Sequence, residues 1–430
     1  MVNNSISSEA SLKSPKTKKT RGTLEAEVLI IGGGLVGATL AIALGSSGLR
    51  VCVVDTVDPI TNLDAKFDGR VSAIALASHH ILKTLGLWAA LDKNAAPILD
   101  IRVSDGDSLF FLHYDHQDTG DKAFGYMVEN RNLRKSLLQR LKSLDTVTLI
   151  APASVVSLKR STNGIEATLT NGLKIRALLS VAADGRGSKT RDQAGIKTTS
   201  WSYKQSGIVC TVSHEKSHNF VANEHFLPAG PFAILPLKGD KKHQGNRSSI
   251  VWTERADLSP SIMALEDSAF KKELQRRFGT FLGDINIVGP KWCYPLSLQY
   301  SHETIANRLA LIGDAAHAMH PIAGQGLNMG LRDVAALAEV IIDANRLGID
   351  IGDKVVLERY QRWRRFDNTL MLVMTDGLNR LFSNNIGPIR LAREIGMALV
   401  NKTPPLKKFF MRHAMGMVGD LPRLMRNQPL

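Results

Sequence analysis

Three glycines near the N-terminus have the type and spacing that bind a phosphate group. Gly32, Gly34 and Gly37 form a G-x-G-x-x-G pattern, with Val36 inside it, directly after the apolar run 28–31. The first glycine permits a tight turn, the second lets a pyrophosphate approach the backbone, and the third lets a helix pack closely on a strand. The positive end of that helix then faces the anion. The pattern therefore predicts a dinucleotide site.

An acidic residue follows at the distance that such a site needs. Asp55 comes 18 residues after the last glycine and closes a second apolar run, 51–54. A carboxylate there accepts hydrogen bonds from a ribose and disfavours a 2′-phosphate. The uncharged stretch 28–49 is long enough to cross a bilayer, but its six glycines indicate a turn between strand and helix instead. These residues leave NAD and FAD undistinguished.

Two further segments combine a predicted strand with glycine and aspartate. The apolar run 308–312 leads into Gly313 and Asp314, whose carboxylate can accept a hydrogen bond from a ribityl hydroxyl. A second glycine-rich helix start follows, in which backbone N–H groups can bind a flat heterocycle or its phosphates; it contains Gly324, Gln325, Gly326, Leu327 and Asn328. A strand, loop and helix capped only for stability is the alternative. Asp184 ends another strand, which in isolation is a common turn.

Metal and cysteine chemistry are disfavoured. His317 and His320, with Asp314, could imitate a two-histidine, one-carboxylate iron site. They follow a strand end and share no helix face, and the aspartate has a use of its own, so we predict no metal. Three widely separated cysteines predict neither a disulfide framework nor a zinc site. The sequence contains no nucleophile, base and acid triad, and we name no catalytic side chain.

In this order and spacing, the three segments resemble the FAD-dependent aromatic hydroxylases, the class A flavin monooxygenases. Within that family the chain looks most like the branch that hydroxylates the ring of ubiquinone precursors. Segments 230–237, 313–317 and 320–328 carry this likeness, as do 68–74 and 414–416. The resemblance implies that the first glycine pattern holds the ADP half of FAD. It places Asp184 near the pyrophosphate and Gly313 and Asp314 at the ribityl chain and flavin.

The resemblance also implies the remaining site residues. Arg70 matches an early flavin-site arginine of the family and Arg131 a more weakly shared one, while Pro321 is expected beside flavin and substrate. The expected cofactor-binding residues are Gly32, Gly34, Val36, Gly37, Asp55, Arg70, Arg131, Asp184, Gly313, Asp314, Gly324, Gln325, Gly326, Leu327 and Asn328. NAD(P)H or reduced ferredoxin would reduce the flavin, O₂ would add at its C4a carbon, and the terminal oxygen would go to an electron-rich phenol ring.

Composition and pattern predict an α/β fold. The chain has 430 residues, 44% of them hydrophobic and 22% charged, which suits a folded protein with more than one domain. We expect a Rossmann-like FAD-binding domain with an inserted antiparallel-sheet substrate domain and a helical C-terminal region. The expected ranges are a disordered basic tail at 1–22, FAD-binding segments at 23–100, 131–198 and 301–345, substrate-domain segments at 101–130 and 199–300, and the helical region at 346–430.

The positive charge of the chain indicates which partners it could bind. The net charge is +14, and residues 385–430 hold eight Lys or Arg against two Asp or Glu, interleaved with apolar side chains. This mixture suits an anionic bilayer, where a prenylated phenol would reside, although a solvated, oligomer-packing helix pair is equally compatible. We expect a cytoplasmic protein at the inner membrane, working with other quinone-biosynthesis proteins. No nucleic-acid motif accompanies the charge. A mitochondrial presequence is a weaker reading of the tail.

Two other functions stay open on the sequence alone. One is a flavin hydroxylase for a soluble aromatic acid, which would need no membrane contact. The other is a non-catalytic, lipid-binding subunit of a quinone-biosynthesis assembly that has kept the fold.

Overall fold

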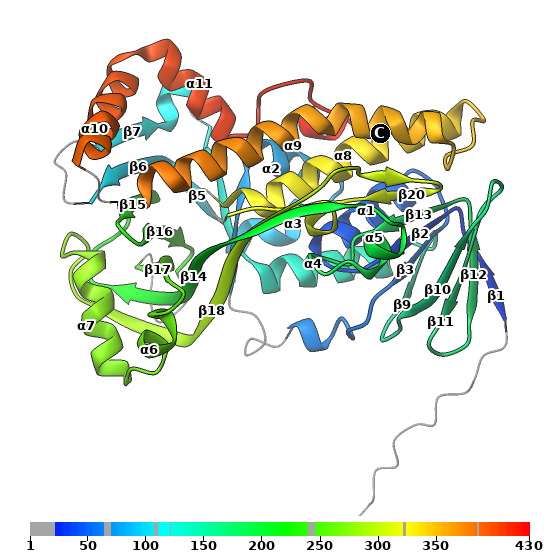
Figure 1. Cartoon of the computed structure of the whole chain (residues 1–430), viewed down its shortest axis with the longest axis horizontal. Helices are drawn as coiled ribbons and strands as arrows, with labels where there is room; N and C mark the ends of the chain where they lie inside the picture. Colours follow the sequence, from blue (N-terminus) through cyan, green and yellow to red (C-terminus); the bar gives the residue numbers. More distant parts are fainter. Residues whose placement is uncertain are drawn as a thin grey trace, which may run out of the picture.

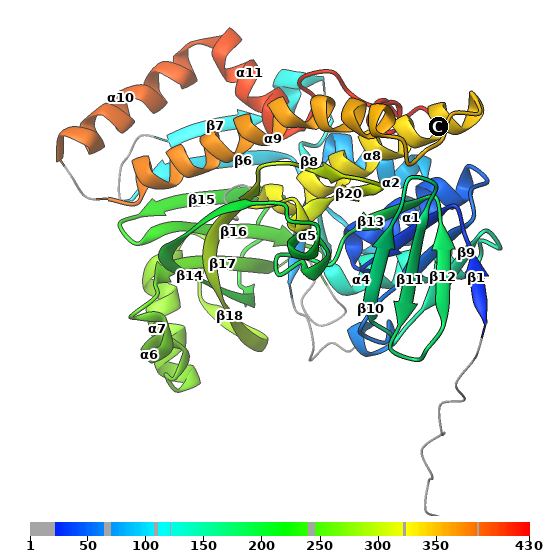
Figure 2. The same ribbon diagram turned by 45° about the vertical axis from the view of Figure 1, so that its right-hand side comes forward.

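The chain folds around two large sheets that share one long helix. The computed structural model describes residues 22–63, 70–106, 111–120, 122–239, 246–320, 324–384 and 387–430. One sheet is mostly parallel and carries the glycine pattern, and the other is mostly antiparallel, with one parallel pair of strands. Helix α9 (Lys354–Phe382) runs across both parts. Helices α10 (Gly387–Lys402) and α11 (Pro404–Ala414) follow it in the chain and lie above the antiparallel sheet (Figures 1 and 2).

The first sheet has the order β19-β20-β13-β2-β3-β9, parallel except between β19 and β20. Its strands are β2 (Val28–Ile31), β3 (Val51–Val54), β9 (Val147–Ile150), β13 (Leu179–Ala182), β19 (Ile305–Ala306) and β20 (Leu309–Leu311). Every residue of β2, β3 and β13 is buried, as expected for strands covered on both faces. Helices α1 (Leu35–Ser46), α4 (Asn130–Lys142) and α8 (Gln325–Arg346) pack in its core. The predicted Rossmann-like architecture is confirmed.

The second sheet has the order β21-β18-β14-β17-β16-β15-β6-β7. Its strands are β6 (Asp100–Asp105), β7 (Phe111–Asp115), β14 (Thr198–His214), β15 (Val221–Leu227), β16 (Gly230–Leu237), β17 (Arg247–Arg255), β18 (Ile285–Ser301) and β21 (His317–Ala318). The predicted strands at 208–212 and 249–253 pair antiparallel within β14 and β17. One face buries Ile208, Phe232 and Trp252 against α7 (Asp267–Phe278), beside α6 (Ser259–Met263). Because side chains alternate along a strand, the other face is left for a ligand.

Two smaller sheets complete the strands of the described residues. A three-stranded sheet contains β4 (Val71–Ala75), β5 (Ala96–Ile98) and β8 (Gly125–Glu129). A four-stranded sheet contains β1 (Thr23–Glu25), β10 (Val155–Arg160), β11 (Ile165–Leu169) and β12 (Lys174–Ala177). Sequence analysis did not predict the second of these, although the alternately buried Ile165, Ala167 and Leu169 carry the period of a half-buried strand.

Short helices join these elements. They are α2 (Leu76–Thr84), α3 (Trp88–Leu91), α5 (Lys189–Gln193), and the 3₁₀ turns η1 (Thr61–Leu63), η2 (Asp92–Asn94), η3 (His116–Thr119), η4 (Gly313–Ala315) and η6 (Arg423–Arg426). The stretch 28–49 forms a strand, a turn and helix α1, as its glycines predicted. Among the helices of the described ranges, none combines the length and apolar character needed to cross a bilayer.

Candidate functional site

One cavity of about 1370 Å³ reaches from the glycine turn to the antiparallel sheet. Gly34 and Val36 line one part of it, and the N-terminal turn of α8 lines another. Alternate residues of β15, β16 and β17 line a third part, and α9 to α11 close over it. A pocket for one small ligand measures about 300–1,000 Å³. This cavity therefore has room for a cofactor and a second molecule together.

The three glycines of the first turn have different surroundings. A Cβ atom on Gly32, whose φ is +107°, would lie 2.2 Å from the carbonyl oxygen of Ala183, and one on Gly37 would lie 2.0 Å from that of Gly32. A Cβ atom on Gly34 would meet nothing within 4 Å. Gly32 and Gly37 are therefore required by close packing, whereas the space at Gly34 is open to the cavity at the N-terminus of α1. A pyrophosphate fits this open helix end.

Asp55 shapes the turn from the end of β3. Its Oδ2 accepts a hydrogen bond from the backbone N–H of Gly33 at 2.6 Å, and its Oδ1 accepts one from Val57 at 2.9 Å. A carboxylate offers about four lone-pair sites. The remaining sites can still accept a hydroxyl proton, so the backbone contacts are compatible with the predicted ribose contact.

Asp184 and Arg131 do not line the cavity. The Asp184 carboxylate accepts hydrogen bonds from the hydroxyl groups of Ser188 and Thr190, the latter at 2.9 Å, and so holds the start of α5. Its neighbours Gly185 and Arg186 line the cavity instead. Arg131 is exposed on the first turn of α4.

On α4 the cavity is lined by Asn130 and Arg134, which sequence analysis missed. These two residues are four apart and so share one face of the helix. The same face carries the buried Leu133, Leu137 and Leu141. Polar residues at this spacing along a buried helix face are a signal that would have identified them. Arg70, which is expected at the flavin site, lines the cavity, and its guanidinium lies 5.4 Å from the ring centre of Tyr294.

The second glycine-rich helix start, which is expected to bind the cofactor, lines the cavity. Gly324, with a φ of +63°, precedes α8, and all five residues from 324 to 328 line the cavity. Asn328 also ties this turn to β4, because its Oδ1 accepts from the N–H of Ala75 at 2.9 Å and its Nδ2 donates to Ala73 at 2.8 Å. The predicted Pro321 lies outside the described residues.

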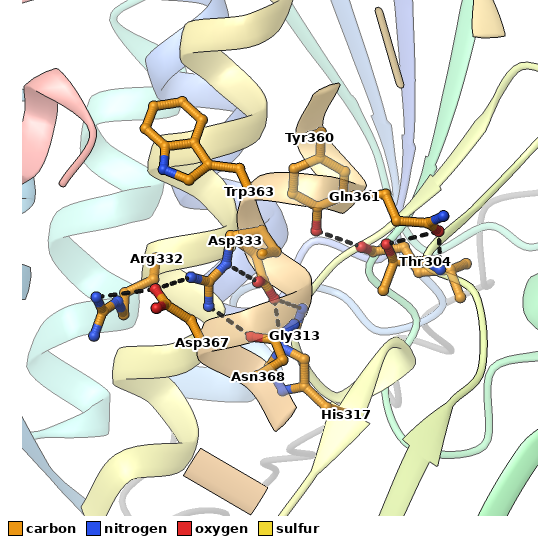
Figure 3. A network of polar contacts seen from close by, with 12 residues as sticks. Thr304, Gly313, His317, Arg332, Asp333, Tyr360, Gln361, Trp363, Asp367 and Asn368 are labelled. Atoms are coloured by element: carbon orange, nitrogen blue, oxygen red, sulfur yellow. Dashed lines mark hydrogen bonds and ion pairs between the residues drawn. The ribbon is translucent and has the colours of Figure 1, made fainter. Parts of the chain in front are cut away.

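A buried carboxylate supports the Gly313–Asp314 turn from behind. Asp314 lines the cavity, while the N–H of Gly313 donates to Oδ2 of Asp333 at 2.9 Å. The same oxygen contacts His317 Nε2 at 2.7 Å, and Arg364 Nε donates to the other oxygen at 2.8 Å (Figure 3). Burial alone would raise the pKa of Asp333, but these two partners hold the pKa below its usual value. The turn is thus anchored by a charged network that does not itself face the cavity.

The network extends along α9. Arg364 donates to Asp367 at 2.8 Å and to Asn368 at 2.7 Å, and Arg332 of α8 lies 3.1 Å from the same Asp367 (Figure 3). The Tyr360 hydroxyl donates to the carbonyl of Leu311 at 2.8 Å, at the end of β20. These contacts join α8, α9 and the strand that precedes the Gly313–Asp314 turn.

The histidines of this region do not form an iron site with Asp314. His317 Nε2 is held by Asp333, and Asp314, His317 and His320 do not bring their ligand atoms within 4.8 Å of one another. Elsewhere in the described ranges, Asp100, Asp115 and His116 place ligand atoms within 4.8 Å of one another. His113 already contacts the Asp100 carboxylate at 2.9 Å. Paired surface acids of this kind are common without an ion, so we assign no metal there.

A parallel sheet that carries a glycine turn, joined to an antiparallel sheet over one shared cavity, defines the flavin-dependent aromatic hydroxylase class. Residues 25–365 match the FAD-binding domain family. The chain belongs to this family, as sequence analysis predicted, and it is an FAD-dependent monooxygenase.

Two relatives support this assignment, and one solved structure supports the fold. The chain is 54% identical over 408 residues to ubiquinone hydroxylase UbiL of Rhodospirillum rubrum, with 94% of each protein covered. It is 34% identical to 3-demethoxyubiquinol 3-hydroxylase of Escherichia coli, covering 91% of this chain and 98% of that one. The p-nitrophenol 4-monooxygenase PnpA of Pseudomonas putida has the same fold, with a TM-score of 0.75 at 20% identity, covering 91% of this chain and 98% of that one. The predicted ubiquinone-hydroxylase branch is confirmed by the first two.

Proposed function

We propose that this chain hydroxylates the aromatic ring of a polyprenylated phenol in ubiquinone biosynthesis. The cofactor is FAD, the co-substrate is O₂, and the electron donor is NAD(P)H or reduced ferredoxin. One observation carries the proposal: the cavity that begins at the cofactor turns continues into a largely apolar chamber over the antiparallel sheet. The names of the two ubiquinone-pathway relatives support the choice of substrate.

In this proposal the cofactor lies along the turns that line the cavity. The ADP half binds at the N-terminus of α1, over the open Gly34 and beside Asp55. The ribityl chain and flavin ring lie between Asp314 and the turn that starts at Gly324. Arg70, Arg134 and Arg186 bring positive charge to the same cavity, which suits an anionic cofactor. Asp184 acts through the loop before α5, which its carboxylate holds, and Arg131 contributes from the first turn of α4.

Bound flavin supplies the redox chemistry and the activation of oxygen. The chain's own residues then have to position the ring, exclude water and keep the reacting groups close. The buried network behind Gly313 meets the positioning requirement, because it fixes the turn through Asp333. Pro321 is proposed to lie beside flavin and substrate.

The chamber suits a prenylated molecule. Its sheet side includes Ile101, Val103 and Leu112, and its helical side includes Met397 and Val400. Isoprene units are apolar, so such walls bind them through the hydrophobic effect.

The outer surface of α10 and α11 suits a membrane. On α10, Ile395 and Leu399 are 61% and 59% exposed, and on α11 Phe409 is 47% exposed. Exposed basic side chains, Lys402, Lys408 and Arg412, lie on the same two helices. Apolar side chains bordered by cations bind an anionic bilayer from its surface. Because the opposite face of α10 lines the cavity, we propose that the substrate enters from the membrane beneath these helices. We also propose that the protein works beside other quinone-biosynthesis proteins.

A strain that lacks this protein tests the proposed function. We expect mass spectrometry of its lipid extract to show a prenylated quinone precursor that lacks one ring hydroxyl, and expression of the protein should restore the mature quinone. Unchanged quinone levels without any accumulated precursor would contradict the proposal. A defect confined to soluble aromatic acids would favour the second function considered from the sequence.

A further inference from the structure

Glu224 is an acidic residue in an otherwise apolar wall of the cavity. It lies on β15, paired with Val103 of β6 on one side and Ala233 of β16 on the other. Val251 of β17 continues the same row across the sheet. All four side chains line the cavity. The small side chain of Ala233 leaves space beside the carboxyl group.

The carboxyl group has no hydrogen bond or ion pair with any residue that the structure describes. Asp105, at the same end of the antiparallel sheet, differs, because Arg393 of α10 contacts its carboxylate at 2.8 Å. Leaving a carboxyl group without a partner in an apolar site costs free energy. Burial accordingly raises the pKa of Glu224 to about 7. The group therefore has an unmet capacity to bind a hydrogen-bonding partner inside the cavity.

The other titratable groups of the chamber come from the neighbouring elements. Tyr114 of β7 lines it from the sheet, and burial raises the pKa of its hydroxyl. His413 of α11 lines it from the helical side, and burial lowers its pKa. Arg393 also lines it but is paired with Asp105. Asp314, the other acidic residue that lines the cavity, lies at the Gly313 turn. Among the described residues, Glu224 is thus the acidic group of the apolar chamber, and its carboxyl group has no partner there.

We propose that Glu224 binds the hydroxyl group of the phenolic substrate and accepts its proton during hydroxylation. This inference rests on the proposed function, because it requires a phenol in the chamber. A phenol O–H is a donor that matches an unpartnered carboxylate oxygen. Because the side chains around Glu224 are apolar and cannot donate a hydrogen bond, the substrate hydroxyl is the donor that its carboxylate can accept from.

The proton transfer balances within the proposed reaction. As the ring carbon takes up a hydroxyl group, positive charge develops on the phenol oxygen, its O–H bond breaks and the proton passes to Glu224. The ring carbon then loses its hydrogen as a proton to water, which makes the ring aromatic again, and Glu224 returns its proton to the substrate oxygen. The electron donor and O₂ of the proposed function supply the oxidation, and the second oxygen atom leaves as water. A base with a pKa near the working pH is well suited to this step.

The kinetic test compares Glu224→Gln with the wild type, both loaded with FAD. In a single turnover with a prenylated phenol, we expect Gln to slow hydroxylation by about 100-fold or more and to divert reduced flavin to hydrogen peroxide. The wild-type rate should rise with pH through the ionisation of Glu224 near 7. The variant's rate should lack this rise. Glu224→Asp should restore part of the rate.

A spectroscopic test does not need turnover. An alkyl-substituted 4-nitrophenol, whose ionised form is yellow, serves as the probe for a bound phenolic hydroxyl. In the wild type, ionised Glu224 should hold the bound probe in its colourless, protonated form at a pH where Glu224→Gln binds it yellow. His225→Gln is the matched control, since His225 is the next residue on β15 and contacts Ser104 at 2.7 Å instead of lining the cavity. It should behave as the wild type.

Equal single-turnover rates, pH profiles and probe spectra for the wild type and Glu224→Gln would overturn the inference. If the wild type hydroxylates no prenylated phenol, the proposed function fails first. The probe spectrum then still decides whether Glu224 contacts a phenolic hydroxyl, so the two failures are distinguishable.

Discussion

At the scale of single residues, two glycines of the first turn have different roles, one in packing and one in ligand binding. Gly34→Ala adds a methyl group that meets no protein atom within 4 Å. We expect the free energy of unfolding of this variant to stay within about 0.5 kcal/mol of the wild-type value, as for surface substitutions. We expect FAD binding to weaken by about 1.4 kcal/mol or more, which is a tenfold rise in Kd. Thermal unfolding of the apoprotein and titration with FAD measure the two effects.

Gly32→Ala is the contrasting variant. Its Cβ atom would lie 2.2 Å from the Ala183 carbonyl oxygen, at a φ of +107°. We expect the free energy of unfolding to fall by at least about 2 kcal/mol. Equal stability of the two variants, or unchanged FAD affinity in Gly34→Ala, would contradict the roles assigned to these glycines.

Glu224 also gives the stability a pH dependence of known sign. Its pKa is about 7 in the folded chain against an ordinary value of 4.5, so ionisation above pH 4.5 favours the unfolded chain. The resulting loss of stability grows until the pH passes 7 and then stays constant. The stability advantage of Glu224→Gln over the wild type should therefore rise by about 3 kcal/mol between pH 4.5 and 7.5.

Denaturant unfolding of both proteins at the two pH values measures this rise. Glu273→Gln is the control of opposite sign, because a hydrogen bond from Arg277 lowers the pKa of Glu273. An advantage of Glu224→Gln that is the same at both pH values would show that the carboxyl group is not buried in the cavity wall.

At the residue scale, motifs in the sequence indicated several residues that line the cavity. Residues that belong to no motif were missed. Gly34, Asp314 and the residues from 324 to 328 line the cavity because a strand end and a helix start bring them there. Asp184, which is expected near the pyrophosphate, does not line the cavity, since the local loop satisfies its carboxylate. Glu224 was missed because no sequence motif marks an acid on a strand whose burial depends on α10 and α11.

At the scale of elements, the Asp333 network fixes the position of the Gly313–Asp314 turn. It joins the Gly313 turn, α8 and α9 through hydrogen bonds of 2.7 to 2.9 Å. Asp333→Asn removes the charge that balances buried Arg364, which breaks a buried pair and costs about 3–5 kcal/mol. We expect the melting temperature to fall by about 5 °C.

Asp353→Asn is the matched control for this change. Asp353 caps α9 at the surface by accepting from the N–H of Val355 at 2.8 Å, and asparagine caps a helix about as well as aspartate. We expect its melting temperature to stay within about 1 °C of the wild type. Calorimetry that gives the same melting temperature for both variants would contradict the anchoring role of Asp333.

The helices and strands that were predicted from the sequence are those with a strong local hydrophobic pattern. The fully apolar runs of β2 and β3 and the long apolar period of α8 were recognised because pattern and length agree. The meander of β10 to β12 was missed, since its strands are short and partly exposed. The pairing order of the antiparallel sheet depends on contacts between distant segments, such as β15 with β6, which one sequence does not specify.

At the scale of the whole molecule, the C-terminal helices both cover the cavity and present an apolar surface. We expect the triple variant Ile395→Ser, Leu399→Ser and Phe409→Ser to lower binding to phosphatidylglycerol vesicles by at least about tenfold. Cosedimentation measures the effect, and higher salt should weaken the residual binding. Neutral phosphatidylcholine vesicles should bind both proteins weakly.

A control triple variant removes comparable apolar area elsewhere. Leu347, Ile349 and Phe281 are 75%, 48% and 45% exposed and lie outside α10 and α11. Serine at these three positions should leave vesicle binding unchanged. Equal loss of binding in both triple variants would contradict a membrane surface on α10 and α11.

The central claim is that FAD in this cavity hydroxylates the ring of a prenylated phenol. The most direct measurement supplies the purified, FAD-loaded protein with an electron donor, a prenylated phenol in vesicles and ¹⁸O₂, followed by mass spectrometry of the product. We expect a prenylated product with one new ring hydroxyl that contains ¹⁸O. A product whose new oxygen comes from water, or reduced flavin that reoxidises without any ring product, would contradict the claim.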